Sequence, residues 1–164
     1  MNAVSFTAII LTGALISEVH AVNLQPCVQQ SDISAYRTFA KRHILSKSFD
    51  RNSLQEWESY LRLNGLCGRQ PTQSFIDAKA KDVKGICKTL GRLIQDAPQS
   101  QGNFCISQST MRVYDVKSDG RCKITSAKGV DKRVVVRCAK VGKTCLPIHF
   151  EAYRNQTPSK TYCS

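Results

Sequence analysis

Two histidines are the side chains in this sequence that are best suited to proton transfer. The chain contains three, His20, His43 and His149, and we expect His20 to be removed with an N-terminal leader. An imidazole has an unperturbed pKa of about 6.5, so near neutral pH it can either accept or donate a proton. His43 and His149 could therefore serve as a general base and a general acid. Their spacing alone does not require this, because isolated surface or packing histidines are more common.

The first histidine lies at the end of a predicted helix, and the second lies in a predicted strand. Ser31 and Asp32 are both good helix N-caps. The positions that follow at helical spacing are Ile33, Tyr36, Ala40 and His43. This spacing puts His43 on the inward edge of the helix, while His149 belongs to an expected strand at 144–153.

The other elements form an early helical part and a late part made of strands. Ser53 and Glu56 form a capping box for a second helix, which Gly65 is expected to end and whose apolar stripe is Leu54, Trp57 and Leu61. We then expect a strand at 73–76, a third helix at 78–89 and a surface loop at 91–102. Further strands are expected at 104–116, 121–126 and 133–141, with turns at 117–120 and 128–131. This order predicts an α+β domain.

Residues 1–21 have the features of a secretory signal peptide. Their apolar run, 8–16, is shorter than the roughly 20 residues that span a bilayer. Val19-His20-Ala21 supplies small or apolar residues where signal peptidase would cut, although no lysine or arginine precedes the run. We expect cleavage after Ala21, which leaves a single domain at 22–164, secreted to the extracellular space and without a transmembrane segment.

The chain is strongly basic, with a formal net charge of +12 over 164 residues. Removing residues 1–21 leaves 143 residues and takes away one charged side chain, Glu18, so the mature total is about +13. An excess of this size favours polyanionic partners such as RNA, heparan-type glycans or bacterial surfaces. A basic surface that serves solubility alone is the alternative.

Eight cysteines all follow residue 21, at positions 27, 67, 87, 105, 122, 138, 145 and 163. An even count behind a signal peptide predicts disulfides formed in an oxidising compartment. The cysteines show no paired C-x-x-C spacing, and the two histidines do not follow metal-ligand spacing, so we expect neither a zinc site nor a cofactor.

Three segments resemble signatures of the pancreatic-type ribonuclease (ribonuclease A) superfamily. Phe-Ala-Lys-Arg-His at 39–43 resembles its first-helix signature, Ser-Thr-Met-Arg-Val at 109–113 its central strand, and Pro-Ile-His-Phe-Glu at 147–151 its last strand. The likeness covers the chain from about Tyr36 to Tyr153 and is greatest to secreted, angiogenin-like members such as those of fish. It implies a disulfide-stapled α+β fold with three helices packed on a bent antiparallel sheet, and we expect a monomer.

The resemblance also implies part of the disulfide pattern. By the family pattern, Cys67 would pair with Cys122 and Cys87 with Cys138. Both halves of another family bridge are absent together, one of them replaced by Val116. For the remaining four cysteines, which allow three pairings, we expect Cys27–Cys105 and Cys145–Cys163.

The activity implied by the resemblance is cleavage of single-stranded RNA by transphosphorylation to a 2′,3′-cyclic phosphate, without a metal. His43 would be the base and His149 the acid, and the amide of Phe150 would contact the phosphate. Glu151 stands where an aspartate often orients the acid histidine. Ser74 stands where a threonine reads a pyrimidine edge, so we expect a looser pyrimidine preference.

Two departures from the family pattern predict a weak enzyme. Arg42 replaces a glutamine before the first catalytic histidine, and with Lys41 it is expected to contact phosphate. The family motif Cys-Lys-x-x-Asn-Thr-Phe supplies a lysine that stabilises the transition state, but here the segment from Cys67 to Phe75 is two residues longer and has no lysine. Arg69 is the cation in reach, and loss of one such electrostatic contact costs about 10²–10³ in rate.

An alternative is a protein in which catalysis is vestigial. Such a cationic host-defence, antimicrobial or angiogenin-like signalling protein would act by binding polyanions, bacterial surfaces or a cell-surface receptor. Both histidines with Glu151 favour the enzyme, whereas the missing lysine and high charge favour the binding protein. Among minor sites, Asn103 is a candidate contact to a second base. A disulfide-rich toxin or growth factor unrelated to ribonucleases would leave both histidine motifs unexplained.

Overall fold

The computed structural model describes residues 26–95, 103–151 and 156–164. The predicted signal peptide lies outside the described residues. The helices are α1 (Ile33–His43), α2 (Leu54–Leu63) and α3 (Ala80–Gly85). The strands are β1 (Gln30–Ser31), β2 (Thr72–Asp77), β3 (Gly91–Ile94), β4 (Phe104–Ser107), β5 (Met111–Ser118), β6 (Ile124–Lys132), β7 (Val135–Val141), β8 (Thr144–Glu151) and β9 (Pro158–Tyr162).

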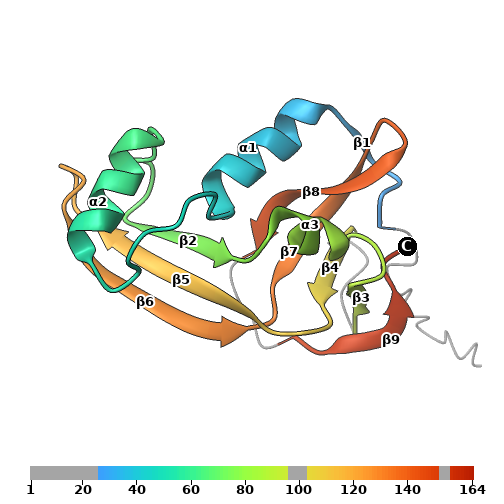
Figure 1. The fold of residues 1–164 in the computed structure, drawn as a ribbon. Coiled ribbons are helices and arrows are strands. Elements are labelled where there is room, and N and C mark those ends of the chain that lie inside the picture. Colours follow the sequence, from blue (N-terminus) through green and yellow to red (C-terminus); the bar gives the residue numbers. More distant parts are fainter. Residues whose placement is uncertain (1–25, 96–102, 152–155) are drawn as a thin grey trace, which may run out of the picture.

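The strands form two sheets (Figure 1). One has the order β2-β5-β6, and the other has the order β1-β7-β4-β3-β9, with β8 also paired to β7. Among these strands of the described residues, each pairing is antiparallel except that of β1 with β7. Helix α1 packs on β8 and β2, and α2 packs on β6. The predicted α+β class is confirmed. No helix in the described ranges is long and apolar enough to cross a membrane.

Helix α1 forms as its sequence predicts. Asp32 is the N-cap, and its carboxylate accepts hydrogen bonds from the backbone N–H groups of Ser34 and Ala35 at 2.7 and 3.1 Å. Phe39 is buried against the sheet, and the last turn is basic, which suits the negative end of the helix dipole. The helix therefore ends at His43, directly before the extended Ile44.

Helix α2 begins with the predicted cap, because the Ser53 side chain accepts from the Glu56 N–H at 3.2 Å. Trp57, Tyr60 and Leu61 are its buried residues, whereas Leu54 is 43% exposed and does not belong to the apolar stripe. Gly65 follows the helix with a φ of +61°, a conformation that favours glycine.

The third helix is shorter than predicted because the chain turns sharply after it. The start of β3 approaches α3 so closely that a Cβ on Gly91 would lie 1.8 Å from the carbonyl oxygen of Ile86. The segment at 91–94, predicted as part of a loop, is therefore a strand in the middle of a sheet. The rest of that loop, 96–102, lies outside the described residues.

Two further predictions about strands are wrong. The expected strand 104–116 is divided into β4 and β5, because the Ser107 hydroxyl bonds the chain at the bend, donating to the Ser109 carbonyl and accepting from the Val134 N–H. The expected turn at 128–131 is part of β6. Gly129 is paired there with Tyr114, and a Cβ at Gly129 would lie 2.7 Å from the Tyr114 ring. The glycine thus makes room for an aromatic neighbour rather than for a turn.

Four disulfides join all eight cysteines. The two pairings implied by the resemblance are present, namely Cys67–Cys122 and Cys87–Cys138. The other two predicted pairings, Cys27–Cys105 and Cys145–Cys163, are wrong. The structure instead contains Cys27–Cys145 and Cys105–Cys163.

Strands that the sequence did not predict explain these pairings. Lys140 of β7 is the partner of both Gln30 in β1 and Cys145 in β8, so the segment before β1 comes close to the start of β8. Cys27 lies in that segment and therefore meets Cys145. At the other end of the sheet, β9 and β4 flank β3, and this arrangement brings Cys163 to Cys105.

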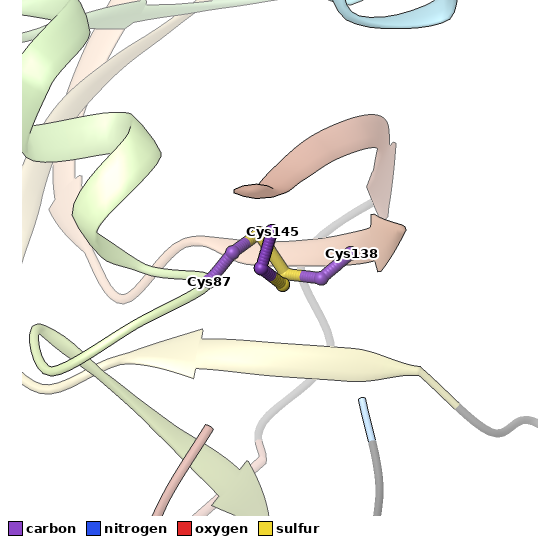
Figure 2. A group of neighbouring side chains, drawn as sticks. All are labelled: Cys87, Cys138 and Cys145. Atoms are coloured by element: carbon purple, nitrogen blue, oxygen red, sulfur yellow. A yellow bond between two sulfur atoms is a disulfide. The ribbon is translucent and has the colours of Figure 1, made fainter. Parts of the chain in front are cut away.

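One group of possible metal ligands comes together in the described part of the chain. The sulfur atoms of Cys87, Cys138 and Cys145 lie within 4.8 Å of one another (Figure 2). Each of the three belongs to a disulfide, so none offers a thiolate. The group is therefore a contact between two disulfides, one of which joins the segment after α3 to β7, while the other joins the segment before β1 to β8.

Candidate active site

His43 is fixed in one tautomer by its backbone partner. Its Nδ1 lies 2.9 Å from the carbonyl oxygen of Ser74 in β2. A carbonyl oxygen can only accept, so Nδ1 carries the proton and donates it. In the neutral ring, Nε2 then holds a lone pair. The geometry gives His43 a nitrogen that can take a proton from a substrate.

The surroundings of His43 lower the pKa of its imidazole to about 4. Burial is the largest cause, since the ring of Phe150 stacks on the His43 ring with centroids 5.2 Å apart and Phe39 lies at 5.6 Å. Positive charge on Arg69, His149 and Arg42 lowers the pKa further, while the hydrogen bond to Ser74 opposes the change. His43 is therefore neutral at physiological pH.

His149 reaches the same site from β8. The pairing of β8 with β7 shifts by one residue, because Arg137 faces His149 while Cys138 faces Pro147, and Ile148 is the extra residue. A bulge of this kind re-aims the side chains beside it. The His149 side chain is 58% exposed, and its Nε2 lies 3.7 Å from the Glu151 carboxylate. That distance is an ion-pair contact longer than a hydrogen bond.

Arg69 is supported by a residue that the sequence analysis did not single out. Its Nη1 donates to the side-chain oxygen of Gln73 at 2.9 Å, and the Gln73 amide nitrogen donates to the Leu66 carbonyl at 2.8 Å. Gln73 is 3% exposed, so it joins the Arg69 loop to a buried anchor. Burial and the nearby Arg42 charge lower the pKa of the Arg69 guanidinium, although arginine stays charged at neutral pH.

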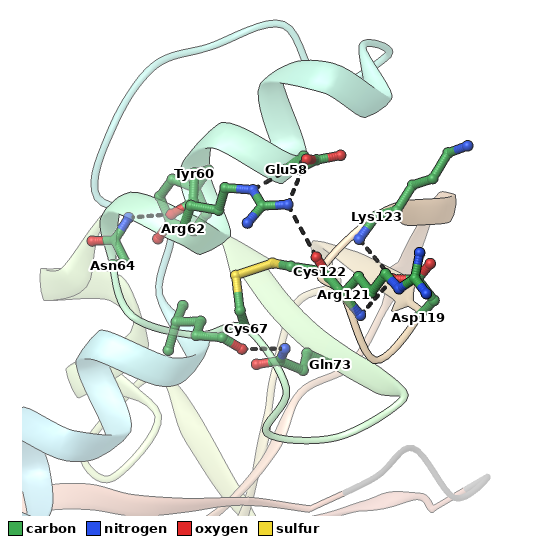
Figure 3. Close-up of a disulfide and its surroundings, with 11 residues drawn as sticks. Glu58, Tyr60, Arg62, Asn64, Cys67, Gln73, Asp119, Arg121, Cys122 and Lys123 are labelled. Carbon is green, nitrogen blue, oxygen red and sulfur yellow. Dashed lines mark hydrogen bonds and ion pairs between the residues drawn. A yellow bond between two sulfur atoms is a disulfide. The ribbon is translucent and has the colours of Figure 1, made fainter.

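The loop that carries Arg69 is also tied at its beginning. Cys67 is bonded to Cys122, which lies in the turn between β5 and β6 (Figure 3). Arg62 of α2 donates to the Arg121 carbonyl at 3.0 Å, and the Asp119 carboxylate accepts from the N–H of Arg121. The end of α2, this turn and the Arg69 loop are therefore held together on one side of the site.

Ser74 takes part in a polar chain that runs across the three-stranded sheet. Its hydroxyl donates to the Asp115 carboxylate at 2.6 Å, and Ser74 and Asp115 are register partners in β2 and β5. The other oxygen of Asp115 lies 3.3 Å from the Lys132 ammonium. With its proton directed to Asp115, the Ser74 hydroxyl keeps lone pairs to accept from a ligand.

The structure brings most of the predicted site residues together. His43, His149, Arg69, Arg42, Ser74, Phe150 and Glu151 are linked by the contacts and charges above. Lys41 lies instead on another face of α1, where it lines a separate cleft. The side chain of Asn103 lies 3.5 Å from Gln29, and no described contact joins it to the residues around His43.

Gln73 and Asp115 contact the candidate site, and the sequence analysis did not single them out. A signal was present for Gln73, which stands directly before Ser74 where the family motif has an asparagine. Asp115 gave none, because its contact with Ser74 depends on the register of β5 with β2. A polar residue in a strand is common on any half-exposed sheet.

No family model and no curated protein sequence matches the chain. Among solved structures, the X-ray structure of zebrafish RNase5 is similar to it, with a TM-score of 0.56 and 16% sequence identity. The match covers 73% of this chain and 94% of the zebrafish chain. At that identity the likeness shows the fold, and the chain has the predicted ribonuclease A-like fold of the α+β class.

Proposed function

We propose that the protein is a secreted, cationic endoribonuclease that cleaves single-stranded RNA by metal-free transphosphorylation, leaving a 2′,3′-cyclic phosphate. The contact between His43 Nδ1 and the Ser74 carbonyl carries the proposal, because it presents a lone pair on Nε2 to a substrate. The fold shared with zebrafish RNase5 supports the same class of activity.

In the proposed reaction, His43 Nε2 takes the proton of the ribose 2′-OH as the 2′-oxygen attacks the adjacent phosphorus. The bond from phosphorus to the 5′-oxygen breaks, and His149 in its protonated form gives a proton to that oxygen. Arg69 and Arg42 stabilise negative charge on the phosphoryl oxygens. Ser74 accepts from the base edge, and Glu151 orients His149 through a loose ion pair.

Two features support low activity. A base with a pKa of about 4 is poorly matched to work near neutral pH, because proton-transfer efficiency follows basicity. Arg69 carries its charge on a planar fork whose geometry differs from that of an ammonium. The protein would therefore cleave RNA more slowly than a relative with a lysine at this place.

A second candidate function is binding of polyanions or cell surfaces with catalysis vestigial. The depressed pKa of His43 and the net charge of +12 favour it. Both functions fit an extracellular monomer. They differ in whether the 2′-OH of bound RNA attacks the adjacent phosphorus, so that the strand is cleaved.

The chemistry is tested with a short, 5′-labelled single-stranded RNA and a matched strand that has one 2′-deoxyribose at the cleavage position. We expect the all-ribose strand to give a 2′,3′-cyclic phosphate, with or without a metal chelator, and the substituted strand to stay intact at that position. Cleavage of the deoxy-substituted strand there, or loss of activity with the chelator, would contradict the proposed mechanism.

A further inference from the structure

A cleft separate from the catalytic group opens beside the end of α1. It has a volume of about 1030 Å³ and lies between α1, the segment 44–51, the end of α2 and the segment that joins β2 to α3. Its walls include apolar side chains such as Ile44 and Ala78, and three exposed lysines line it: Lys41, Lys47 and Lys79. Its described lining contains none of the residues grouped around His43.

Carboxylates in the lining do not neutralise the positive charge of the three lysines. Asp77 is the one carboxylate in its described lining, and Arg51 already holds both oxygens, with Nε and Nη2 each at 3.2 Å. Across the described ranges, no ion pair joins Lys41, Lys47 or Lys79 to a carboxylate. The three ammonium groups therefore leave a local charge suited to an anionic ligand.

The lining favours a sulfated sugar chain over single-stranded RNA. Proteins that bind single strands offer exposed aromatic rings on which bases stack. Phe49 is the aromatic side chain of the described lining, and its ring is already packed against other side chains of the protein. The Arg51 guanidinium lies 3.8 Å from the ring centroid, and the Tyr60 ring stacks on it at 5.1 Å. What the lining offers a ligand is therefore the ammonium groups of the three lysines beside apolar side chains. This combination suits the sulfate groups and sugar rings of a glycan.

We propose that this cationic cleft binds a sulfated glycan, with the sulfates at Lys41, Lys47 and Lys79 and the sugar rings over the apolar side chains. The site does not depend on His43 or His149. It gives the polyanion-binding alternative a location, and it can coexist with ribonuclease activity.

The test compares two double variants of the full mature chain. Lys47→Gln with Lys79→Gln removes two cleft charges, and Lys117→Gln with Lys123→Gln removes two exposed charges on β5 and the turn before β6. Binding of a heparin-derived hexasaccharide is measured by calorimetry at physiological ionic strength. We expect the cleft variant to bind about five- to tenfold more weakly and the control variant to change by less than about twofold. RNA cleavage by the cleft variant stays at the parent rate.

Equal losses in the two variants would overturn the proposal, because affinity would then follow net charge alone. Loss of single-stranded RNA binding with unchanged hexasaccharide binding would also overturn it and would make the cleft a nucleic-acid site. A parent chain that cleaves no RNA but shows the expected hexasaccharide pattern would contradict the proposed catalytic function and support this site.

A second measurement uses the unmutated chain, so it does not depend on the folding of a variant. Lysine amines are acetylated with and without the hexasaccharide and located by mass spectrometry. We expect protection of Lys41, Lys47 and Lys79, while Lys117 and Lys123 react equally in both samples. Absence of protection at the cleft lysines under saturating hexasaccharide would overturn the proposal.

Discussion

Arg69 and Gln73 form a hydrogen-bonded pair, with the Arg69 Nη1 2.9 Å from the Gln73 side-chain oxygen. Gln73 is buried and anchored to the Leu66 carbonyl. The family motif has a lysine and an asparagine in this segment, whereas this chain has an arginine and a glutamine on a loop two residues longer. The pairing supports Arg69 as the replacement for the missing lysine, with Gln73 as its positioning residue.

This relationship predicts a specific pattern of non-additive losses. Arg69→Ala should lower kcat for RNA cleavage by about 10²–10³, with a smaller effect on KM, because it removes charge stabilisation in the transition state. Gln73→Ala should cost less by itself and nothing further in the Arg69→Ala background, because it acts through Arg69. Steady-state kinetics of the four proteins would show this.

Gln73→Ala also leaves the Leu66 carbonyl without its partner, at a cost of about 1–3 kcal/mol in stability. Urea unfolding of each variant therefore accompanies the kinetics, so that rates are compared between folded proteins. If the fold-decreases in kcat of the two single variants multiply in the double variant, Gln73 does not act by positioning Arg69.

The pH dependence of cleavage should report the environment of His43. As a base, His43 must be unprotonated, and its pKa is about 4, below the ordinary value of 6.5. The acid limb of kcat/KM should therefore lie well below pH 6.5. Because the Arg42 charge lowers this pKa, Arg42→Gln should move the limb to higher pH. The matched control is Arg37→Gln, an exposed arginine in the same helix, and an equal displacement in both variants would contradict this account.

The same pKa has a consequence for stability. Between pH 6.5 and about 4 the unfolded chain protonates this imidazole and the folded chain does not, so protons favour unfolding and stability falls as pH is lowered. From pH 7 to pH 4.5 the loss due to His43 should be about 2 kcal/mol. His43→Gln should show a correspondingly smaller decrease in the free energy of unfolding, measured in urea at both pH values. An identical pH dependence in both proteins would mean that His43 titrates normally in the folded state.

The disulfide pattern is open to direct mapping. Digestion of the unreduced protein should release peptides joined through Cys27–Cys145 and Cys105–Cys163. Replacing Cys105 and Cys163 together with alanine should lower the free energy of unfolding by about 2–5 kcal/mol, since their bridge closes a separation of 58 residues. Peptides joined through Cys27–Cys105 would contradict the observed arrangement of β1 and β9.

The parts of the molecule that sequence predicts well are those with local causes. The N-cap at Asp32, the helical spacing up to His43 and the short strand expected at 73–76 all depend on residues close together in the chain. The structure has a helix at Ile33–His43 and a strand at Thr72–Asp77. The overall α+β order follows from the same local signals. These elements bring His43 and Ser74 into contact.

The features that escaped prediction depend on neighbours far away in the sequence. Strands β1, β3 and β9 are short and polar or lie in segments rich in turn residues, so their pairing is decided by the sheet and not by their own composition. Missing them led directly to the wrong partners for Cys27 and Cys105. Gln73 and Asp115 likewise acquire their roles from contacts that only the folded chain creates.

The most direct test of the central claim is cleavage of a fluorescent single-stranded RNA by the refolded mature chain beside His149→Ala prepared in the same way. His149 is exposed, with one loose contact to Glu151, so its replacement should leave the fold intact and remove the general acid. We predict slow cleavage by the parent and none above background by the variant. Equal traces from the two proteins would contradict catalysis at this site.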